Sequence, residues 1–371
     1  WHADTLTVYF MFIAENFIQF KKLFASRLKQ MLSDSELGAF ILVLANSQQD
    51  TDLKVELNQD IQRSFDALKE SISSVKKHST QDDIDVFEQL ENLKIQDIVE
   101  WQYKKVGRWE LAYNSMRQLR PARSAKQSFD SIRKKFDETQ FHFNKPFLKP
   151  EILWEGGYLD KKLRVLYNKF PFSDYHLLIA VSPETNSPQL LTKETHHLIF
   201  SLTQDSVKKF PGFGVGFNSL AAGASVNHLH CQGFIREVDF PIEDSCWLHN
   251  GGSVKFPLNA SVFVDVESSW DYIDQLTESN IAFNCLYRES RCYVVPRKFQ
   301  GTVDLPGWLE GAGWLDVVGV VTVSDKVDFE SVTEPVSYTH LRAHETRYVI
   351  SYSVFFLKNR GGGGGGGGGG G

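Results

Sequence analysis

The first hundred residues place apolar side chains at helical spacing. Phe17, Phe20 and Phe24 recur every three or four positions, which predicts an amphipathic helix with one apolar face. Polar and apolar residues alternate with the same period over residues 51–77, and residues 82–100 also fit a helix. The pattern therefore predicts helices that bury one face against a neighbouring layer.

One short segment of this region is apolar without interruption. Residues 39–46, "AFILVLAN", fit either a buried strand or a buried turn of helix, because periodicity does not separate the two in so short a run. We expect a mainly helical N-terminal region over residues 1–100. No residue in it suggests chemistry, so its expected role is to pack against, or cover, the part that follows.

After Trp101 the pattern changes to the period of β-strands. Polar and apolar positions alternate in short segments separated by glycine- and proline-containing links, which predicts an antiparallel meander. A capped helix is expected over residues 192–210, and two strands about a turn over residues 280–301. The other predicted strands cover residues 108–119, 151–159, 162–170, 175–182 and both ends of 212–235. The fold class is thus α+β, an antiparallel sheet flanked by helices, over residues 101–335.

Neither end of the chain has the sequence expected of an intact folded protein. Residues 336–346, "VSYTHLRAHET", resemble a translated sequencing-library adapter, and residues 361–371 are all glycine. We expect residues 336–371 to be read-through with no part in the fold, since glycine has no side chain to bury. Trp1 in place of methionine suggests that the N-terminus is incomplete or wrongly started.

Composition limits the kinds of partner. The formal net charge is −6 at pH 7, so an electrostatic nucleic-acid binder is not expected, and no segment is long and apolar enough to predict a membrane span. None of the four cysteines forms a Cys-x-x-Cys pair, which argues against a zinc knuckle or a thioredoxin-type motif. Without a convincing signal peptide, we expect reduced thiols and a cytoplasmic protein.

Residues 118–145 are the most basic segment of this acidic chain. A solvated basic face is one interpretation. The other is an anion-binding edge, where Arg120, Arg123 and Lys145 meet phosphate groups.

The strongest chemical signal is "SVNHLHCQGF", residues 225–234. In a strand, alternate residues line one face, so His228, His230 and Gln232 are expected to project together while Cys231 faces the core. A neutral imidazole is a good nucleophile near neutral pH, and a glutamine NH₂ group can hold a phosphate oxygen as charge grows on it. The preceding small-residue loop, "FNSLAAGAS", adds the hydrogen-bond donors Asn218, Ser219 and Ser225, and its backbone NH groups can approach a phosphate closely.

Three interpretations of the histidines remain open at this point. They are a structural pair in a core strand, a His-x-His metal site, or the centre of covalent nucleotidyl transfer. The metal site needs a further ligand, and Gln232 is a poor one. Candidates for the further ligand are His142, Asp174, His176 and His249.

The same residues carry a resemblance to a known family. "SVNHLHCQ" resembles the His-x-His-x-Gln strand in the transferase branch of the histidine-triad (HIT-like) superfamily, and most closely that of the GDP-hexose phosphorylases. Further similar segments are "RPARSAKQSFDSIRKKFDETQFHFNK", "YNKFPFSDYHLLI" and "GFGVGFNSLAAGAS". The resemblance covers about residues 108–297 and implies a HIT-like antiparallel half-barrel. Cys231 departs from the family, whose members tend to have phenylalanine there.

The resemblance implies roles for single residues. His230 falls on the nucleophile, His228 on a supporting hydrogen-bonding residue, and Gln232 on the residue that holds the transferred phosphoryl group. Asn218 and Ser225 fall where related uridylyltransferases place an asparagine near the nucleophile and a serine on phosphate. Arg120, Arg123 and Lys145 are our candidates for stabilising phosphate charge.

The implied reaction is a ping-pong phosphorolysis of a GDP-hexose by inorganic phosphate. It needs no cofactor or metal, and its expected partners are a nucleoside diphosphate sugar and phosphate, with neither nucleic acid nor membrane. A homodimer is an option that the sequence leaves open. Alternatives are a dinucleoside polyphosphate phosphorylase, a HIT-type nucleotide hydrolase, a metal-binding protein, and a nucleotide-binding protein without turnover.

Overall fold

The computed structural model describes residues 12–333, apart from residues 35, 94, 96–97, 99, 120–128 and 303–311. The described helices are α1 (Phe17–Met31), α2 (Leu37–Ser47), α3 (Thr51–Val75), α4 (Gln81–Asn92), α5 (Lys193–Ser206), α6 (Val266–Glu278), α7 (Trp314–Val317) and α8 (Lys326–Ser331). The described strands are β1 (Gln102–Val106), β2 (Trp109–Tyr113), β3 (Ile152–Tyr158), β4 (Lys161–Tyr167), β5 (Leu177–Val181), β6 (Phe213–Asn218), β7 (His230–Ile235), β8 (Ser261–Phe263), β9 (Ala282–Arg288), β10 (Arg291–Arg297) and β11 (Val320–Val323).

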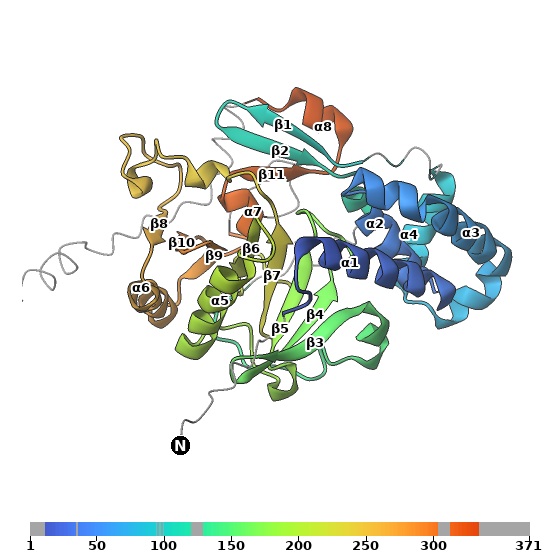
Figure 1. Ribbon diagram of the computed structural model, residues 1–371, viewed down its shortest axis with the longest axis horizontal. Helices are drawn as coiled ribbons and strands as arrows, with labels where there is room; N and C mark the ends of the chain where they lie inside the picture. Colours follow the sequence, from blue (N-terminus) through green and yellow to red (C-terminus); the bar gives the residue numbers. More distant parts are fainter. Residues whose placement is uncertain are drawn as a thin grey trace, which may run out of the picture.

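The N-terminal helices form as the apolar spacing predicts. Asn16, Asp50 and Thr80 cap α1, α3 and α4 by accepting a hydrogen bond from a backbone NH group in the first turn. The ambiguous run at residues 39–46 lies in α2, where it is buried on all sides between α1, α3 and α4. This helix cluster lies at one side of the molecule in Figure 1. The predicted helix over residues 82–100 ends earlier, at Asn92.

Eight of the described strands form one antiparallel sheet. Their order is β3-β4-β5-β7-β6-β9-β10-β8, and the predicted meander is its β3-β4-β5 part. A smaller sheet of β1, β2 and β11 lies beside it, and there β11 runs parallel to β2. The predicted α+β class, an antiparallel sheet flanked by helices, is confirmed.

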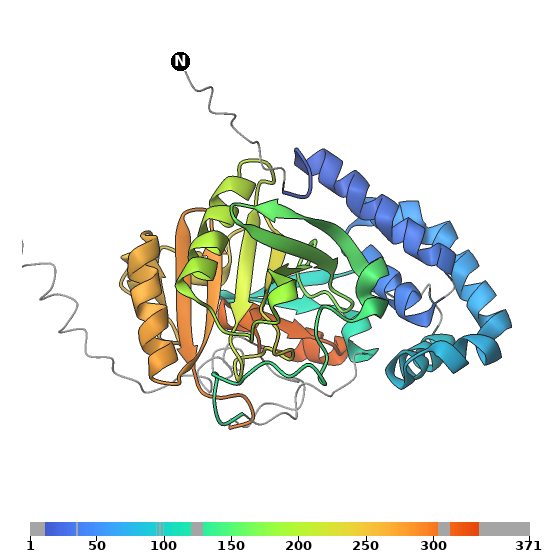
Figure 2. The same cartoon turned by 90° about the horizontal axis from the view of Figure 1, so that it is seen from below.

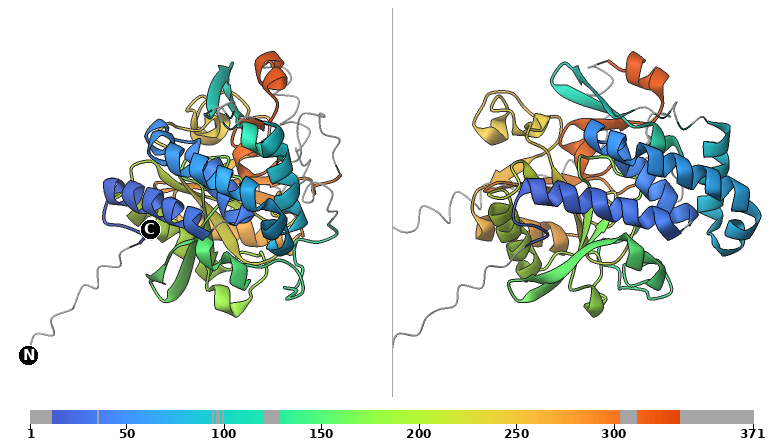
Figure 3. Two further views of the ribbon diagram at one scale, coloured as in Figure 1. Left: turned by 90° about the vertical axis from the view of Figure 1, so that its right-hand side faces the viewer. Right: turned by 45° about the vertical axis from the view of Figure 1, so that its right-hand side comes forward.

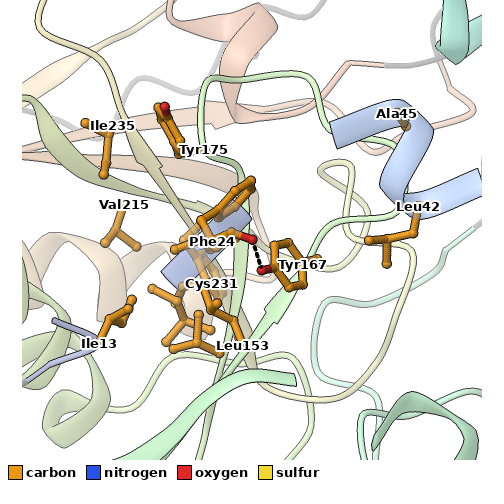
Figure 4. Close-up of a cluster of buried hydrophobic side chains, with 14 of the residues drawn as sticks. Ile13, Phe24, Leu42, Ala45, Leu153, Tyr167, Tyr175, Val215, Cys231 and Ile235 are labelled. Atoms are coloured by element: carbon orange, nitrogen blue, oxygen red, sulfur yellow. Dashed lines mark hydrogen bonds between the residues drawn. The ribbon is translucent and has the colours of Figure 1, made fainter. Parts of the chain in front are cut away.

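The large sheet has two different faces. Side chains such as Val165, Ile179, Val215, Cys231 and Cys285 point to the face we call the helix-covered face, where they share one apolar core with α1, α2 and α5. Figures 2 and 3 show the helices arranged over the sheet. Figure 4 shows the centre of this core, in which the Tyr167 hydroxyl donates a 2.7 Å hydrogen bond to the Phe24 carbonyl.

The alternate residues of the same strands point to the other face, which we call the site face. It carries two apolar clusters. Phe143, Leu148, Leu166 and Ala180 form one over β4 and β5, and a second that includes Phe234, Leu286 and Trp314 lies over β7 and β9. Polar side chains from β6, β7, β9 and β10 point to the same face. They are Asn218, His230, Gln232, Asn284 and Arg297, all buried.

Candidate active site

His230 is the first residue of β7 and lies at the centre of the site face. Its ring is 4.9 Å from the ring of Phe143, and the residue is 5% exposed. The ring Nδ1 lies 2.8 Å from the His228 carbonyl oxygen. A carbonyl only accepts, so Nδ1 carries the proton and Nε2 keeps its lone pair. Burial lowers the pKa of His230 to about 4, which keeps the imidazole neutral at pH 7.

His228 is held in the opposite tautomer. Its Nδ1 accepts a 3.1 Å hydrogen bond from the Phe143 backbone NH, and its Nε2 donates to the Pro183 carbonyl at 3.1 Å. Both ring nitrogens are thus occupied, and burial lowers the pKa of His228 to about 4. The strand begins two residues later than the motif predicts, so His228 precedes β7. Its carbonyl, and not its ring, supports His230.

The backbone around His230 is held by a residue that the sequence analysis did not single out. The Gln189 side chain donates to the carbonyls of Asn218 and His230, at 2.9 and 3.0 Å, and accepts from the His230 NH at 2.9 Å. The β6–β7 ladder ends at the Gly216–Gln232 pair. The Gln189 amide therefore takes the place of the next rung and fixes the start of β7.

Gln232 and Asn218 present their carboxamides on the same face as His230. The Gln232 Oε1 accepts a 2.7 Å hydrogen bond from the Trp314 indole NH. The Asn218 Oδ1 accepts from the Trp314 backbone NH at 2.8 Å and from Asn284 Nδ2 at 2.6 Å. With both amide oxygens used, each residue offers its NH₂ group as a donor, the polarity that an anionic oxygen requires.

The other predicted donors differ in their surroundings. The Ser219 hydroxyl donates to the Leu220 carbonyl and accepts from the Phe283 NH, so it joins the end of β6 to β9. Ser225 is exposed in the loop before β7, and the Lys145 ammonium donates to the Glu138 carbonyl. Arg120 and Arg123 lie outside the described residues.

Part of the basic segment does lie against the histidine loop. The Asn227 side chain donates to the carbonyls of Lys134 and Lys135, at 3.3 and 2.7 Å, and the Phe136 ring is 5.3 Å from that of His228. Whereas the sequence had singled out Arg120, Arg123 and Lys145 in the basic segment, the structure thus brings residues 134–136 of that segment to the site. Their backbone is bonded by a residue of the histidine motif itself.

The residues considered as further metal ligands are dispersed. His176 contacts Asn168 and Phe172, His249 contacts the Ile242 carbonyl, and Asp174 accepts from the Tyr103 hydroxyl. His142 lies nearest, with its ring 6.0 Å from that of His228. Within the described ranges, no three His, Cys, Asp or Glu residues are grouped so that they could hold a metal ion.

Comparison with known proteins connects this site with one family. Residues 107–234 match the family model described as "GDPGP1-like, N-terminal domain". GDP-D-glucose phosphorylase 1 of Danio rerio is 40% identical over 122 residues, which are 32% of this chain and 34% of that protein. GDP-L-galactose phosphorylase 2 of Arabidopsis thaliana is 26% identical over 196 residues, 46% of this chain and 45% of that protein.

A solved structure shows a weaker likeness. Yeast Ap4A phosphorylase Apa2 aligns with a TM-score of 0.49 and 16% identity, covering 72% of this chain and 96% of that chain. The matches with the GDP-D-glucose phosphorylases span about a third of the length of those relatives. The matched segment holds the His-x-His-x-Gln motif, Gln189 and the loop before β7. Through this segment, the chain is similar to the GDP-hexose phosphorylases.

Proposed function

We propose that the protein is a phosphorylase of nucleoside diphosphate sugars, which converts a GDP-hexose and phosphate into GDP and hexose 1-phosphate. His230 Nε2 attacks the α-phosphorus, forming a P–N bond while the bond from that phosphorus to the bridging oxygen breaks. Hexose 1-phosphate leaves with the bridging oxygen and its electron pair. Inorganic phosphate then attacks the same phosphorus, the P–N bond breaks, and GDP is released with the imidazole regenerated.

One observation carries this proposal, namely the tautomer of His230. A nucleophilic nitrogen must have a free lone pair and must not be protonated at the working pH. The His228 carbonyl holds the proton on Nδ1, and burial lowers the pKa of the ring to about 4. The same carbonyl stabilises positive charge on the ring while the P–N bond exists.

The other site residues take supporting parts in the proposal. The NH₂ groups of Gln232 and Asn218 donate to oxygens of the transferred phosphoryl group, because their amide oxygens are already used. Ser225 and Lys145 bind phosphate groups at the rim of the site, and Arg120 and Arg123 add positive charge. Ser219 acts by holding the loop to β9.

The proposed partners are a nucleoside diphosphate sugar and inorganic phosphate, with no cofactor, no metal, no nucleic acid and no membrane. No described helix has the length and hydropathy to cross a bilayer. We further propose that the protein acts in the cytoplasm, since all four cysteines are free thiols, as expected in a reducing compartment.

The direct test is to trap the intermediate. Protein is incubated with GDP-hexose labelled in the α-phosphate, without phosphate, and should acquire an acid-labile, base-stable label that added phosphate removes as GDP. His230→Ala should neither label nor turn over, a loss of about 10⁴-fold or more in kcat. His78→Ala, at an exposed histidine after α3, is the matched control and should behave as wild type.

Three results would overturn the proposal or part of it. Labelling or phosphorolysis by His230→Ala would exclude the covalent step. Release of the label mainly to water would indicate a hydrolase, and a faster reaction with dinucleoside polyphosphates would replace the sugar substrate. Tight binding of GDP-hexose without turnover would leave only a nucleotide-binding protein.

A further inference from the structure

Trp314 lies far from the histidine motif in sequence and directly on it in space. It is the first residue of α7, which packs on β6 and β9, and its side chain is fully buried. Its ring stacks on that of Phe234 with centroids 4.8 Å apart and an interplanar angle of 17°. A Cβ at Gly216 would come within 2.3 Å of the indole, so only glycine at that point of β6 lets the ring lie on the sheet.

From this position Trp314 makes two hydrogen bonds, one to each carboxamide of the site. The indole NH donates to Gln232 Oε1 and the backbone NH donates to Asn218 Oδ1, at 2.7 and 2.8 Å. Both groups are donors only, so each contact determines which end of the amide is oxygen. An amide that is free to rotate by 180° would place its oxygen where an anionic phosphate oxygen needs a donor.

A second set of bonds fixes the Asn218 amide from the other side. Arg297 Nη1 donates to Asn284 Oδ1 at 3.2 Å, and Asn284 Nδ2 donates to Asn218 Oδ1 at 2.6 Å. A guanidinium only donates, so the orientation of Asn284 follows from Arg297, and that of Asn218 follows from Asn284. Among the described residues, the Gln232 amide makes no second hydrogen bond of this kind. Its orientation depends on the Trp314 indole.

We infer that Trp314 is a positioning residue for phosphoryl transfer, whose indole NH holds the Gln232 amide with its NH₂ group available to the transferred phosphoryl group. This inference depends on the proposed function and extends it to a residue outside the matched segment. Trp314 touches neither substrate nor His230 in this role and acts through Gln232. Its loss should therefore lower kcat and leave the KM for the nucleotide sugar nearly unchanged.

The test is a double-mutant cycle between the two residues. Trp314→Phe retains an aromatic ring beside Phe234 but removes the NH donor, and should lower the kcat of phosphorolysis by about 10-fold, against about 100-fold for Gln232→Ala. In the Gln232→Ala background, Trp314→Phe should change kcat less than about twofold, because the amide that it orients is already absent. Trp109→Phe is the matched control, since Trp109 is a buried indole of the same apolar cluster stacked on Trp247, and its kcat should equal that of wild type.

Multiplicative losses in the double variant, or an equal loss in Trp109→Phe, would show a role in packing only and overturn the inference. A second measurement needs neither activity nor a variant of Trp314. The ¹H–¹⁵N signal of the Trp314 indole should be protected from solvent exchange in wild type and move on Gln232→Leu, and an unmoved signal would exclude the bond. A wild-type protein without phosphorolysis would overturn the proposed function, even if this signal moved.

Discussion

The helix-covered face and the site face of the large sheet are made by the same strands, yet they are filled by different means. On the helix-covered face, Val215, Cys231 and Cys285 pack into one continuous apolar core under α1, α2 and α5. On the site face, apolar packing is interrupted by Asn218, His230 and Gln232, whose polar atoms are joined by directed hydrogen bonds. Apolar packing on the helix-covered face stabilises the fold. The site face has less apolar packing, and its hydrogen bonds hold a neutral imidazole and two amides in fixed orientations.

Buried polar groups are costly unless they are paired, so the site face depends on complete hydrogen bonding. The structure meets this need with donors whose direction is fixed. Carbonyls, backbone NH groups, an indole and a guanidinium determine the tautomers of His228 and His230 and the orientation of Asn218, Gln232 and Asn284. Changes on the helix-covered face should therefore alter stability, and changes on the site face should alter turnover.

The largest expected effect on stability is at the centre of the helix-covered face. Phe24 is fully buried, with its ring 4.7 Å from that of Tyr167 and 5.2 Å from that of Tyr175. Phe24→Ala should lower the free energy of unfolding by about 3–5 kcal/mol, measured by urea denaturation, because it leaves a cavity in a packed core. Activity per folded molecule should not change.

Ile18→Ala provides the control, since Ile18 lies on the same helix and is 68% exposed. Its effect should stay within about 0.5 kcal/mol. A loss of turnover in folded Phe24→Ala protein would show that the two faces are not independent.

The next largest effect is the pH dependence of stability, to which buried histidines on both faces of the sheet contribute. Burial lowers the pKa of His196, near the helix-covered core, and of His228 and His230 to about 4. Between about pH 6.5 and 4 the unfolded imidazoles bind protons while the folded ones stay neutral, so these groups make stability fall as pH falls. Each should account for roughly 2–3 kcal/mol, lost fully only near pH 4.

Glu151 and Asp174 have the opposite effect on stability. Burial raises their carboxyl pKa to about 7 and about 6, so these two groups make stability rise as pH falls. The contribution of one histidine to the pH dependence of stability is therefore measured as a difference between wild type and a variant that lacks it. Unfolding free energies of wild type and His230→Gln at pH 7, 6, 5 and 4 should converge toward low pH. Parallel curves would contradict the lowered pKa of His230.

The smallest of these effects on stability is expected at Gly216. A substitution there should also affect turnover. Gly216→Ala places a methyl group against the Trp314 ring and should destabilise the protein by about 1–3 kcal/mol through overpacking. It should also lower kcat, because the indole is displaced from Gln232. Gly157→Ala, in β3 with open space around its Cβ position, is the matched control for both measurements. Equal kcat values in the two variants would argue against the link from Gly216 to Gln232.

Much of the fold was predictable from local pattern. The spacing of Phe17, Phe20 and Phe24 gave α1, and alternation gave the β3-β4-β5 meander, because burial on one side imposes these periods. The run at residues 39–46 was ambiguous, since a helix buried on all sides shows no period. The division into domains at about residue 100 and the read-through origin of residues 336–371 stay predictions, and the latter lie outside the described residues.

The site was predictable only in part. Alternation placed His230 and Gln232 on one face and Cys231 in the core, as the structure has them. The sequence did not reveal that His228 precedes the strand, with its ring bonded at residues 143 and 183 and its carbonyl on His230. Gln189 and Trp314 carried no signal, because nothing in their neighbours shows that they end up against β7.

The sequence by itself therefore determined which residues bring chemistry to this protein. A His-x-His-x-Gln motif after a small-residue loop has its side-chain chemistry and spacing already in the chain, since both are properties of adjacent residues. The tertiary structure alone decided the state of those groups, such as which nitrogen of His230 holds the proton and which way the Gln232 amide faces. The physical reason is that tautomer, amide orientation and pKa depend on burial and on partners in space, and Gln189 and Trp314 reach the site from 41 and 82 residues away.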